Sequence, residues 1–133
     1  MSFMLDTNIA SHVIRGDRPD IGDRLASLPM AEIVISAVTE GELAFGLAKR
    51  GYPPTLRERV RQFLLRVDVL AWDRDAARAY GDLRASCEGG GVTFAPLDLM
   101  IAAHAVAADA VLVTRDKAFA RVSGPLKTDD WAS

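Results

Sequence analysis

The chain has 133 residues, enough for one domain with a single buried core. Half of its residues are hydrophobic and 26% are charged, a balance that excludes a disordered or low-complexity chain. The formal net charge of −2 gives no overall attraction for nucleic acid, so a polyanionic substrate would need local help. The single cysteine, Cys87, excludes an intramolecular disulfide, and with only two histidines a conventional structural zinc site is not expected.

The apolar stretches predict neither a signal peptide nor a membrane span. At the N-terminus, Asp6 interrupts the apolar run almost at once, and no basic segment precedes it. The longest apolar stretch, LMIAAHAVAADAVLV, is broken by His104 and Asp109 and is rich in alanine. We therefore expect a cytoplasmic protein without membrane association.

Short apolar runs alternate with helical patterns from the beginning of the chain. Ser2–Leu5 predicts a buried strand, and Thr7–Arg15 predicts a helix that ends at Gly16. A turn and a short helix in GDRPDIGDRLASLP lead to a β-branched strand at Glu32–Ser36. A helical pattern then runs from residue 38 to residue 50, where GYPPT breaks it.

The second half of the chain continues this alternation. It predicts a helix over residues 56–66, a strand at Asp68–Trp72, a helix from Asp73 to the glycines at 89–91, a helix from Pro96 to Ala107, a strand at Ala110–Thr114, a short helical turn in KAFARV and an edge strand in SGPLKTDDW. Thr55 and Glu58 predict a capping box for the first of these helices. Strands that alternate with helices predict an α/β fold with a mainly parallel sheet, in one domain over residues 1–133.

Four acidic residues lie at or near places where predicted strands end. Asp6 directly follows the first strand, and Glu42 lies in the first turns of the helix after the second. Asp116 follows the strand at AVLVT by two residues, and Asp98 begins the helix that precedes that strand. Because the carboxyl ends of parallel strands share one edge of a sheet, where ligands bind, we expect these side chains to converge.

Each of these acids also has a structural interpretation. Asp6, Asp98 and Asp116 are of the type favoured at helix N-caps, and Thr39 with Glu42 would make a capping box. For the four acids taken together, the structural interpretation is weaker. Four carboxylates in one crevice would repel one another, and a divalent cation would relieve that repulsion. Oxygen ligands suit Mg²⁺, with Mn²⁺ as a substitute, and such a cation can activate water for phosphodiester cleavage.

Other residues near the acids have simpler interpretations. Glu40 lies two positions from Glu42 on the same predicted helix and so points elsewhere, as a surface residue. His104 lies in an alanine-rich helix, six residues after Asp98, and is interpreted as a packed histidine rather than a general base. A groove for a partner's helix, or simply core, is the interpretation of Leu43, Phe45, Leu47 and Phe63, with core as the default.

Four segments carry a resemblance to a known family: LDTNI, ISAVTEGELAFG, PLDLMIAAHA and LVTRDKAF. Their order and approximate spacing are similar to those of the PIN-domain ribonucleases, and in particular they resemble the VapC toxins of bacterial toxin–antitoxin modules. The segments span residues 5–119, nearly the whole chain. The resemblance implies a five-stranded parallel sheet between helices and a Mg²⁺-dependent endoribonuclease toxin of a type II system. It also implies toxin homodimers and a cognate VapB-type antitoxin that blocks the site.

The resemblance also assigns the residues of the site. The acids that form the metal site in this family correspond here to Asp6, Glu42, Asp98 and Asp116. Asp6 and Asp98 are then direct ligands, Glu42 binds the metal or orients water, and Asp116 acts directly or through water. The residues expected to support these ligands by hydrogen bonds are Thr7, Asn8 and Thr114. The basic residues expected to contact RNA are Arg15, Arg115 and Lys117.

This chemistry predicts RNA products with 5′-phosphate and 3′-hydroxyl ends, because water rather than the ribose 2′-hydroxyl attacks the phosphodiester. Two other classes stay open. A PIN-like fold kept as a non-catalytic binding module would be indicated by loss of an acid, and all four acids are present. Receiver domains and haloacid-dehalogenase-like phosphatases also use acids and Mg²⁺ at strand ends. The phosphatase signature, however, needs an aspartate where this chain has Asn8, and the acidic pair of a receiver is not evident.

Overall fold

Five short parallel strands form the centre of the protein in a computed structural model that describes residues 1–122 and 124–132. The strands are β1 (Ser2–Leu5), β2 (Ile33–Ser36), β3 (Asp68–Leu70), β4 (Ala110–Val113) and β5 (Thr128–Asp129). Their order in the sheet is β3-β2-β1-β4-β5, and every neighbouring pair is parallel. The predicted α/β fold with a parallel sheet is confirmed.

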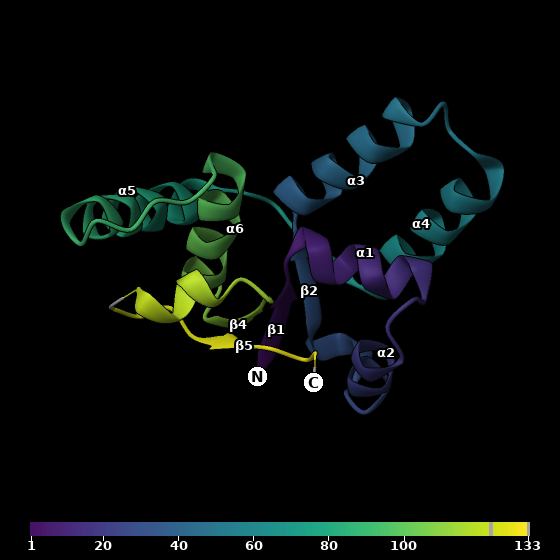
Figure 1. Cartoon of the computed structure of the whole chain (residues 1–133), viewed down its shortest axis with the longest axis horizontal. Coiled ribbons are helices and arrows are strands. Elements are labelled where there is room, and N and C mark those ends of the chain that lie inside the picture. Colours follow the sequence, from purple (N-terminus) through teal and green to yellow (C-terminus); the bar gives the residue numbers. More distant parts are fainter. Residues whose placement is uncertain (123, 133) are drawn as a thin grey trace.

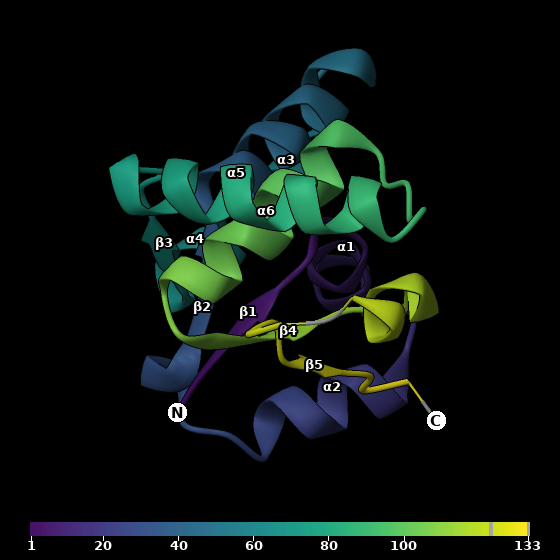
Figure 2. The ribbon, with the colours of Figure 1, turned by 90° about the vertical axis from the view of Figure 1, so that its left-hand side faces the viewer.

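Helices connect these strands and cover both faces of the sheet. The α-helices of the described residues are α1 (Thr7–Arg15), α2 (Pro19–Ala26), α3 (Ala37–Lys49), α4 (Pro54–Arg66), α5 (Arg74–Gly89) and α6 (Pro96–Ala107), and the 3₁₀ helices are η1 (Met30–Glu32) and η2 (Lys117–Arg121). Figures 1 and 2 show α5 and α6 on one side of the sheet and α1, α2 and α4 on the other. None of the helices in these residues has the length and apolar content that a membrane crossing requires.

The strands β1, β2 and β4 send alternate side chains into two separate apolar clusters. Leu5 and Val113 pack with residues of α1 to α4, whereas Met4 and Leu112 pack with residues of α5 and α6. Because both faces of these strands are buried, their sequences are continuous apolar runs rather than alternating ones.

The predicted ends of most helices are confirmed, but the predicted cap of α4 is wrong. Helix α1 ends at Gly16, whose φ of 66° is a left-handed conformation that suits glycine. The capping box of Thr55 and Glu58 does not form, because α4 begins at Pro54, two residues earlier than predicted, without a side-chain cap. Glu58 instead accepts hydrogen bonds from Arg61 within the helix, at 2.7 and 2.9 Å.

Strand β1 lies at the point where the chain changes direction across the sheet. From β1 the chain passes to β2 and β3 on one side, and it then crosses to β4 and β5 on the other. The last residues of β1 and β4, Leu5 and Val113, are paired in register. The residues that follow these two strands therefore lie side by side, in the crevice where open α/β sheets bind ligands.

Candidate active site

Asp6 is held at the carboxyl end of β1 by its own backbone and side chain. Its N–H donates to the carbonyl of Val113 at 3.1 Å, and its carboxylate accepts the N–H of Ile9 at 2.9 Å as the N-cap of α1. The side chain of Thr114 also hydrogen-bonds to this carboxylate. Asp6 is thus a helix cap that also faces the crevice between β1 and β4, so the structural and functional interpretations are compatible.

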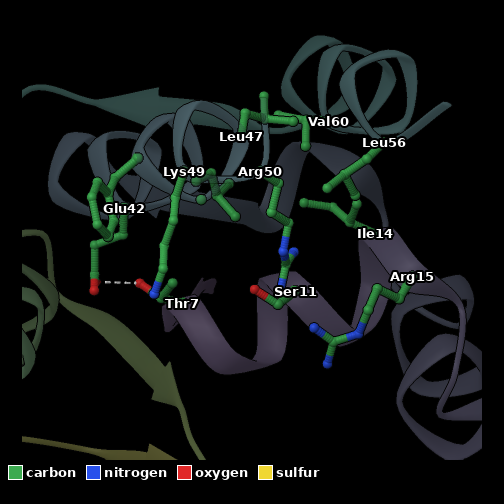
Figure 3. A pocket seen from close by; sticks show the side chains of 13 residues that line it. Thr7, Ser11, Ile14, Arg15, Glu42, Leu47, Lys49, Arg50, Leu56 and Val60 are labelled. Carbon is green, nitrogen blue, oxygen red and sulfur yellow. Dashed lines mark hydrogen bonds between the residues drawn. The ribbon is translucent and has the colours of Figure 1, made fainter. Parts of the chain in front are cut away.

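Glu42 reaches the same region from α3. The buried Ser36, at the end of β2, caps this helix by accepting the N–H of Val38 at 3.1 Å, so the capping box considered for Thr39 and Glu42 does not form. Glu42 is left free to accept a hydrogen bond of 2.6 Å from the hydroxyl of Thr7 (Figure 3). The Thr39 hydroxyl lies 3.4 Å from that of Thr7. This contact joins the first turns of α1 and α3.

Asp98 and Asp116 complete the group from the other side. Asp98 lies in the first turn of α6, where the N-cap is Ala95, so its interpretation as a cap is wrong. Asp116 is the N-cap of η2, because its carboxylate accepts the N–H of Ala118 at 3.0 Å. The N–H of Asp116 donates to the Thr114 hydroxyl at 3.1 Å, which ties this acid to the partner of Asp6.

The four carboxylates of Asp6, Glu42, Asp98 and Asp116, called the acid cluster below, share one electrostatic environment. Burial raises the pKa of Asp6; hydrogen bonds from Ile9 and Thr114 lower it, and the charges of Asp98 and Asp116 raise it further. Burial also raises the pKa of Asp98, and the charges of Glu42 and Asp116 add to that effect. The acids therefore lie near enough to one another for their charges to oppose ionisation of Asp6 and Asp98.

The donor set of the acid cluster fits a hard divalent cation. Its oxygens are those that Mg²⁺ and Mn²⁺ prefer, and a cation would remove the repulsion that raises the pKa of Asp6 and Asp98. Within residues 1–122 and 124–132, no three acidic, histidine or cysteine side chains stand close enough to share one ion. Binding would therefore require the carboxylates to move closer together.

Of the other six residues expected at the site, four lie at the acid cluster and two do not contact it. Thr7 and Thr114 contact members of the acid cluster as described above, and Arg115 and Lys117 are exposed on either side of Asp116. Asn8 is exposed on α1, and no hydrogen bond among the described residues joins it to the cluster. Arg15 lies at the far end of α1, where its Nε donates to Asp17 at 2.9 Å.

A groove of about 400 Å³ runs from the acid cluster between α1, α3 and α4. Thr7 and Glu42 lie at one end of it, and Lys49 and Arg50 extend from α3 toward α1 (Figure 3). The apolar residues among those that line it are Ile14, Leu43, Phe45, Leu47, Leu56 and Val60. Phe45 is 66% exposed, whereas Leu43 and Phe63 are buried, so the apolar residues considered for a groove divide between groove and core.

Comparison with known proteins identifies the fold family. A family model described as "PIN domain" matches residues 3–125. The chain is 36% identical to the tRNA(fMet)-specific endonuclease VapC of Shigella flexneri, over 99% of each chain. It is 32% identical to ribonuclease VapC2 of Rickettsia felis, over 98% of each. This chain belongs to the VapC group of the PIN-domain family.

Solved structures of PIN-domain complexes have the same fold as this chain. The VapBC2 complex of Rickettsia felis bound to a promoter DNA fragment aligns with a TM-score of 0.90 and 30% identity. That alignment covers 98% of this chain and 99% of the other. A DNA-bound VapBC of Salmonella typhimurium aligns with a TM-score of 0.89 and 33% identity, over 99% of each chain. The predicted PIN architecture is therefore confirmed.

His104 stabilises this PIN domain away from the acid cluster. Its Nδ1 lies 2.7 Å from the hydroxyl of the buried Ser36, and its ring also hydrogen-bonds to the backbone of Ala71. Burial lowers the pKa of His104, which keeps the ring neutral near pH 7. The interpretation as a packed histidine is confirmed. The contact with Ser36 was not predicted, although a serine between a strand and a helix is a recognised cap signal.

Proposed function

We propose that this protein is a Mg²⁺-dependent endoribonuclease and the toxin of a type II toxin–antitoxin pair. The observation that carries the proposal is the acid cluster at the crevice between β1 and β4, where burial and, to a smaller extent, the neighbouring carboxylates raise the pKa of Asp6 and Asp98. The substrate class is supported by the names of the relatives, which are ribonucleases and a tRNA(fMet)-specific endonuclease. Mn²⁺ would replace Mg²⁺, because both prefer oxygen ligands.

The residues of the acid cluster have distinct parts in this proposal. Asp6 and Asp98 would hold the cation, with Asp116 acting directly or through water. When bound, Mg²⁺ would supply activation of the attacking water and neutralisation of the charge that develops on the phosphodiester. Glu42 is oriented by the Thr7 hydroxyl at 2.6 Å and would bind the cation or orient the water. A metal-independent mechanism based on histidine is disfavoured, because His104 is buried against Ser36.

The proposal predicts the chemistry of the RNA ends. Purified total RNA incubated with the protein and Mg²⁺ should give discrete products with 5′-phosphate and 3′-hydroxyl ends, and EDTA should stop the reaction. Adapter ligation that depends on a 5′-phosphate, followed by sequencing, measures this and identifies the RNA. Products with 2′,3′-cyclic phosphate would contradict the mechanism. Absence of cleavage by folded, antitoxin-free protein that binds Mg²⁺ would favour the non-catalytic binding module instead.

We further propose that RNA and antitoxin use different surfaces beside the acid cluster. Arg115 and Lys117 are exposed next to Asp116, where they would contact phosphates of the bound RNA. The groove between α1, α3 and α4 has an apolar lining that suits a partner's amphipathic segment rather than a polyanion. A VapB-type antitoxin lying there would cover Glu42. The solved VapBC complexes with the same fold support such a partner.

Two substitutions at exposed positions separate these surfaces. Lys117→Ala should weaken RNA binding. It should also reduce the slope of log affinity against log salt concentration by about 1, which corresponds to the loss of one phosphate contact. Phe45→Ser should weaken inhibition by the antitoxin about tenfold or more, because an exposed aromatic side chain is a typical anchor for a partner. Each variant is the control for the other, and both are measured by RNA affinity across a salt series and by antitoxin titration. An unchanged salt slope for Lys117→Ala, or unchanged inhibition of Phe45→Ser, would contradict the respective assignment.

A further inference from the structure

Two phenylalanine rings stack on each other beside the acid cluster. The rings of Phe94 and Phe119 are nearly parallel, with an interplanar angle of 7° and a centroid distance of 4.3 Å. Phe119 lies in η2 and is only 4% exposed, whereas Phe94 is half-buried in the connection between α5 and α6. Phe119 also belongs to the apolar cluster that contains Leu99 of α6.

The stack joins the two segments that carry Asp98 and Asp116. Phe94 lies two residues before the beginning of α6, whose first turn carries Asp98, and Phe119 lies in the short helix that Asp116 caps. No hydrogen bond or ion pair within residues 1–122 and 124–132 links the beginning of α6 to η2. The two segments are therefore joined by apolar contacts, and the stacked pair is a direct one among them.

Within the acid cluster, the Asp116 carboxylate accepts the N–H of Ala118 at 3.0 Å, and among the described residues only Asp98 lacks such a bond. The carboxylates of Asp6 and Glu42 accept hydrogen bonds from Ile9 and Thr7, at 2.9 and 2.6 Å. The Asp98 carboxylate accepts none from the described residues, and it is repelled by the charges of Glu42 and Asp116. Something other than polar contacts must keep Asp98 and Asp116 near each other in the metal-free protein.

We propose that the stack of Phe94 on Phe119 is a positioning device that keeps the segments carrying Asp98 and Asp116 side by side, so that both carboxylates can close on one divalent cation. This inference rests on the proposed metal-dependent function. By fixing the two segments in advance, the stack reduces the ordering that cation binding would otherwise require. The two phenylalanines would act on cation binding through Asp98 and Asp116, so they are positioning residues.

Phe94→Leu tests the inference, because leucine preserves an apolar side chain but removes the stacked ring. We expect the affinity for Mn²⁺, measured directly by the electron paramagnetic resonance of free Mn²⁺, to fall about tenfold. Phe94→Tyr keeps the ring and should bind Mn²⁺ as the wild type does. Tyr80→Leu is the matched control: it disrupts another aromatic pair, Trp72 with Tyr80 at 6.2 Å, and should leave the Mn²⁺ affinity unchanged.

Hydrogen exchange in the metal-free protein gives a second measurement. Phe94→Leu should increase exchange of the backbone amides of η2, while the amides of β1 keep their protection. Wild-type Mn²⁺ affinity in Phe94→Leu, or an equal loss in Tyr80→Leu, would overturn the positioning role and leave the proposed nuclease intact. If the wild type binds no Mn²⁺, or if Asp98→Asn binds it equally well, the proposed metal site fails and the positioning role fails with it.

Discussion

Asp6→Asn is expected to lower RNA cleavage by at least about 10³-fold without unfolding the protein. Asparagine is as good an N-cap as aspartate, so the side chain can still accept the N–H of Ile9. The negative charge that would bind the cation is lost. Cleavage rates under single-turnover conditions with saturating Mg²⁺ measure the effect, and Asp23→Asn, at an exposed position of α2, is the control.

The same variant, although it loses activity, should be more stable than the wild type in the absence of metal. Because the pKa of Asp6 is raised in the folded protein, ionisation at neutral pH opposes folding. This cost disappears as the pH falls through the folded pKa toward the ordinary value of aspartate. In EDTA at pH 7, Asp6→Asn should therefore melt about 4 °C above the wild type, which corresponds to about 1 kcal/mol. Added Mg²⁺ should raise the melting temperature of the wild type only. A less stable Asp6→Asn in EDTA would contradict the electrostatic interpretation of the cluster.

His104→Leu should lower the free energy of unfolding by about 1–3 kcal/mol, because the buried Ser36 hydroxyl, which still accepts the N–H of Val38, loses its contact with the imidazole. The pH dependence should change as well. Since burial lowers the pKa of His104 in the folded protein, the unfolded chain binds a proton first as the pH falls below about 6.5. Wild-type stability should therefore decrease from pH 7.5 to pH 5.5 more than that of His104→Leu.

Urea denaturation at both pH values measures this difference, and RNA cleavage at pH 7.5 completes the experiment. We expect the folded fraction of His104→Leu to cleave RNA at close to the wild-type rate. A loss of cleavage comparable to that of Asp6→Asn would instead make His104 part of the chemistry. Such a result would overturn its interpretation as a packed histidine.

The sequence predicts the strands and the convergence of the acids because both follow from local patterns and one rule of topology. Apolar runs mark β1, β2 and β4, and parallel strands place Asp6 and Asp116 at the same edge of the sheet. Predicted strands extend one or two residues too far at Trp72 and Thr114, where the backbone leaves the sheet. Strand ends of this kind depend on pairing with a neighbour, which the sequence of one segment does not contain.

Contacts between distant segments could not be predicted in the same way. The hydrogen bond of His104 to Ser36 and the stack of Phe94 on Phe119 depend on how α6 packs against β2 and η2. The predicted capping box at Thr55 was wrong because proline at the start of α4 moved the beginning of the helix. The exposure of Phe45 likewise depends on the placement of α3 against α1 and α4.

The position of β1 in the sheet divides the acid cluster by local stability. Met4 and Leu5 are fully buried, and β1 is paired on both sides, so Asp6 can leave its place only when the whole sheet comes apart. Asp116 caps a five-residue 3₁₀ helix, which can open while the sheet stays folded. Local opening of η2, with loss of the stack, would thus release Asp116 and leave Asp6 as a fixed template on which the site re-forms.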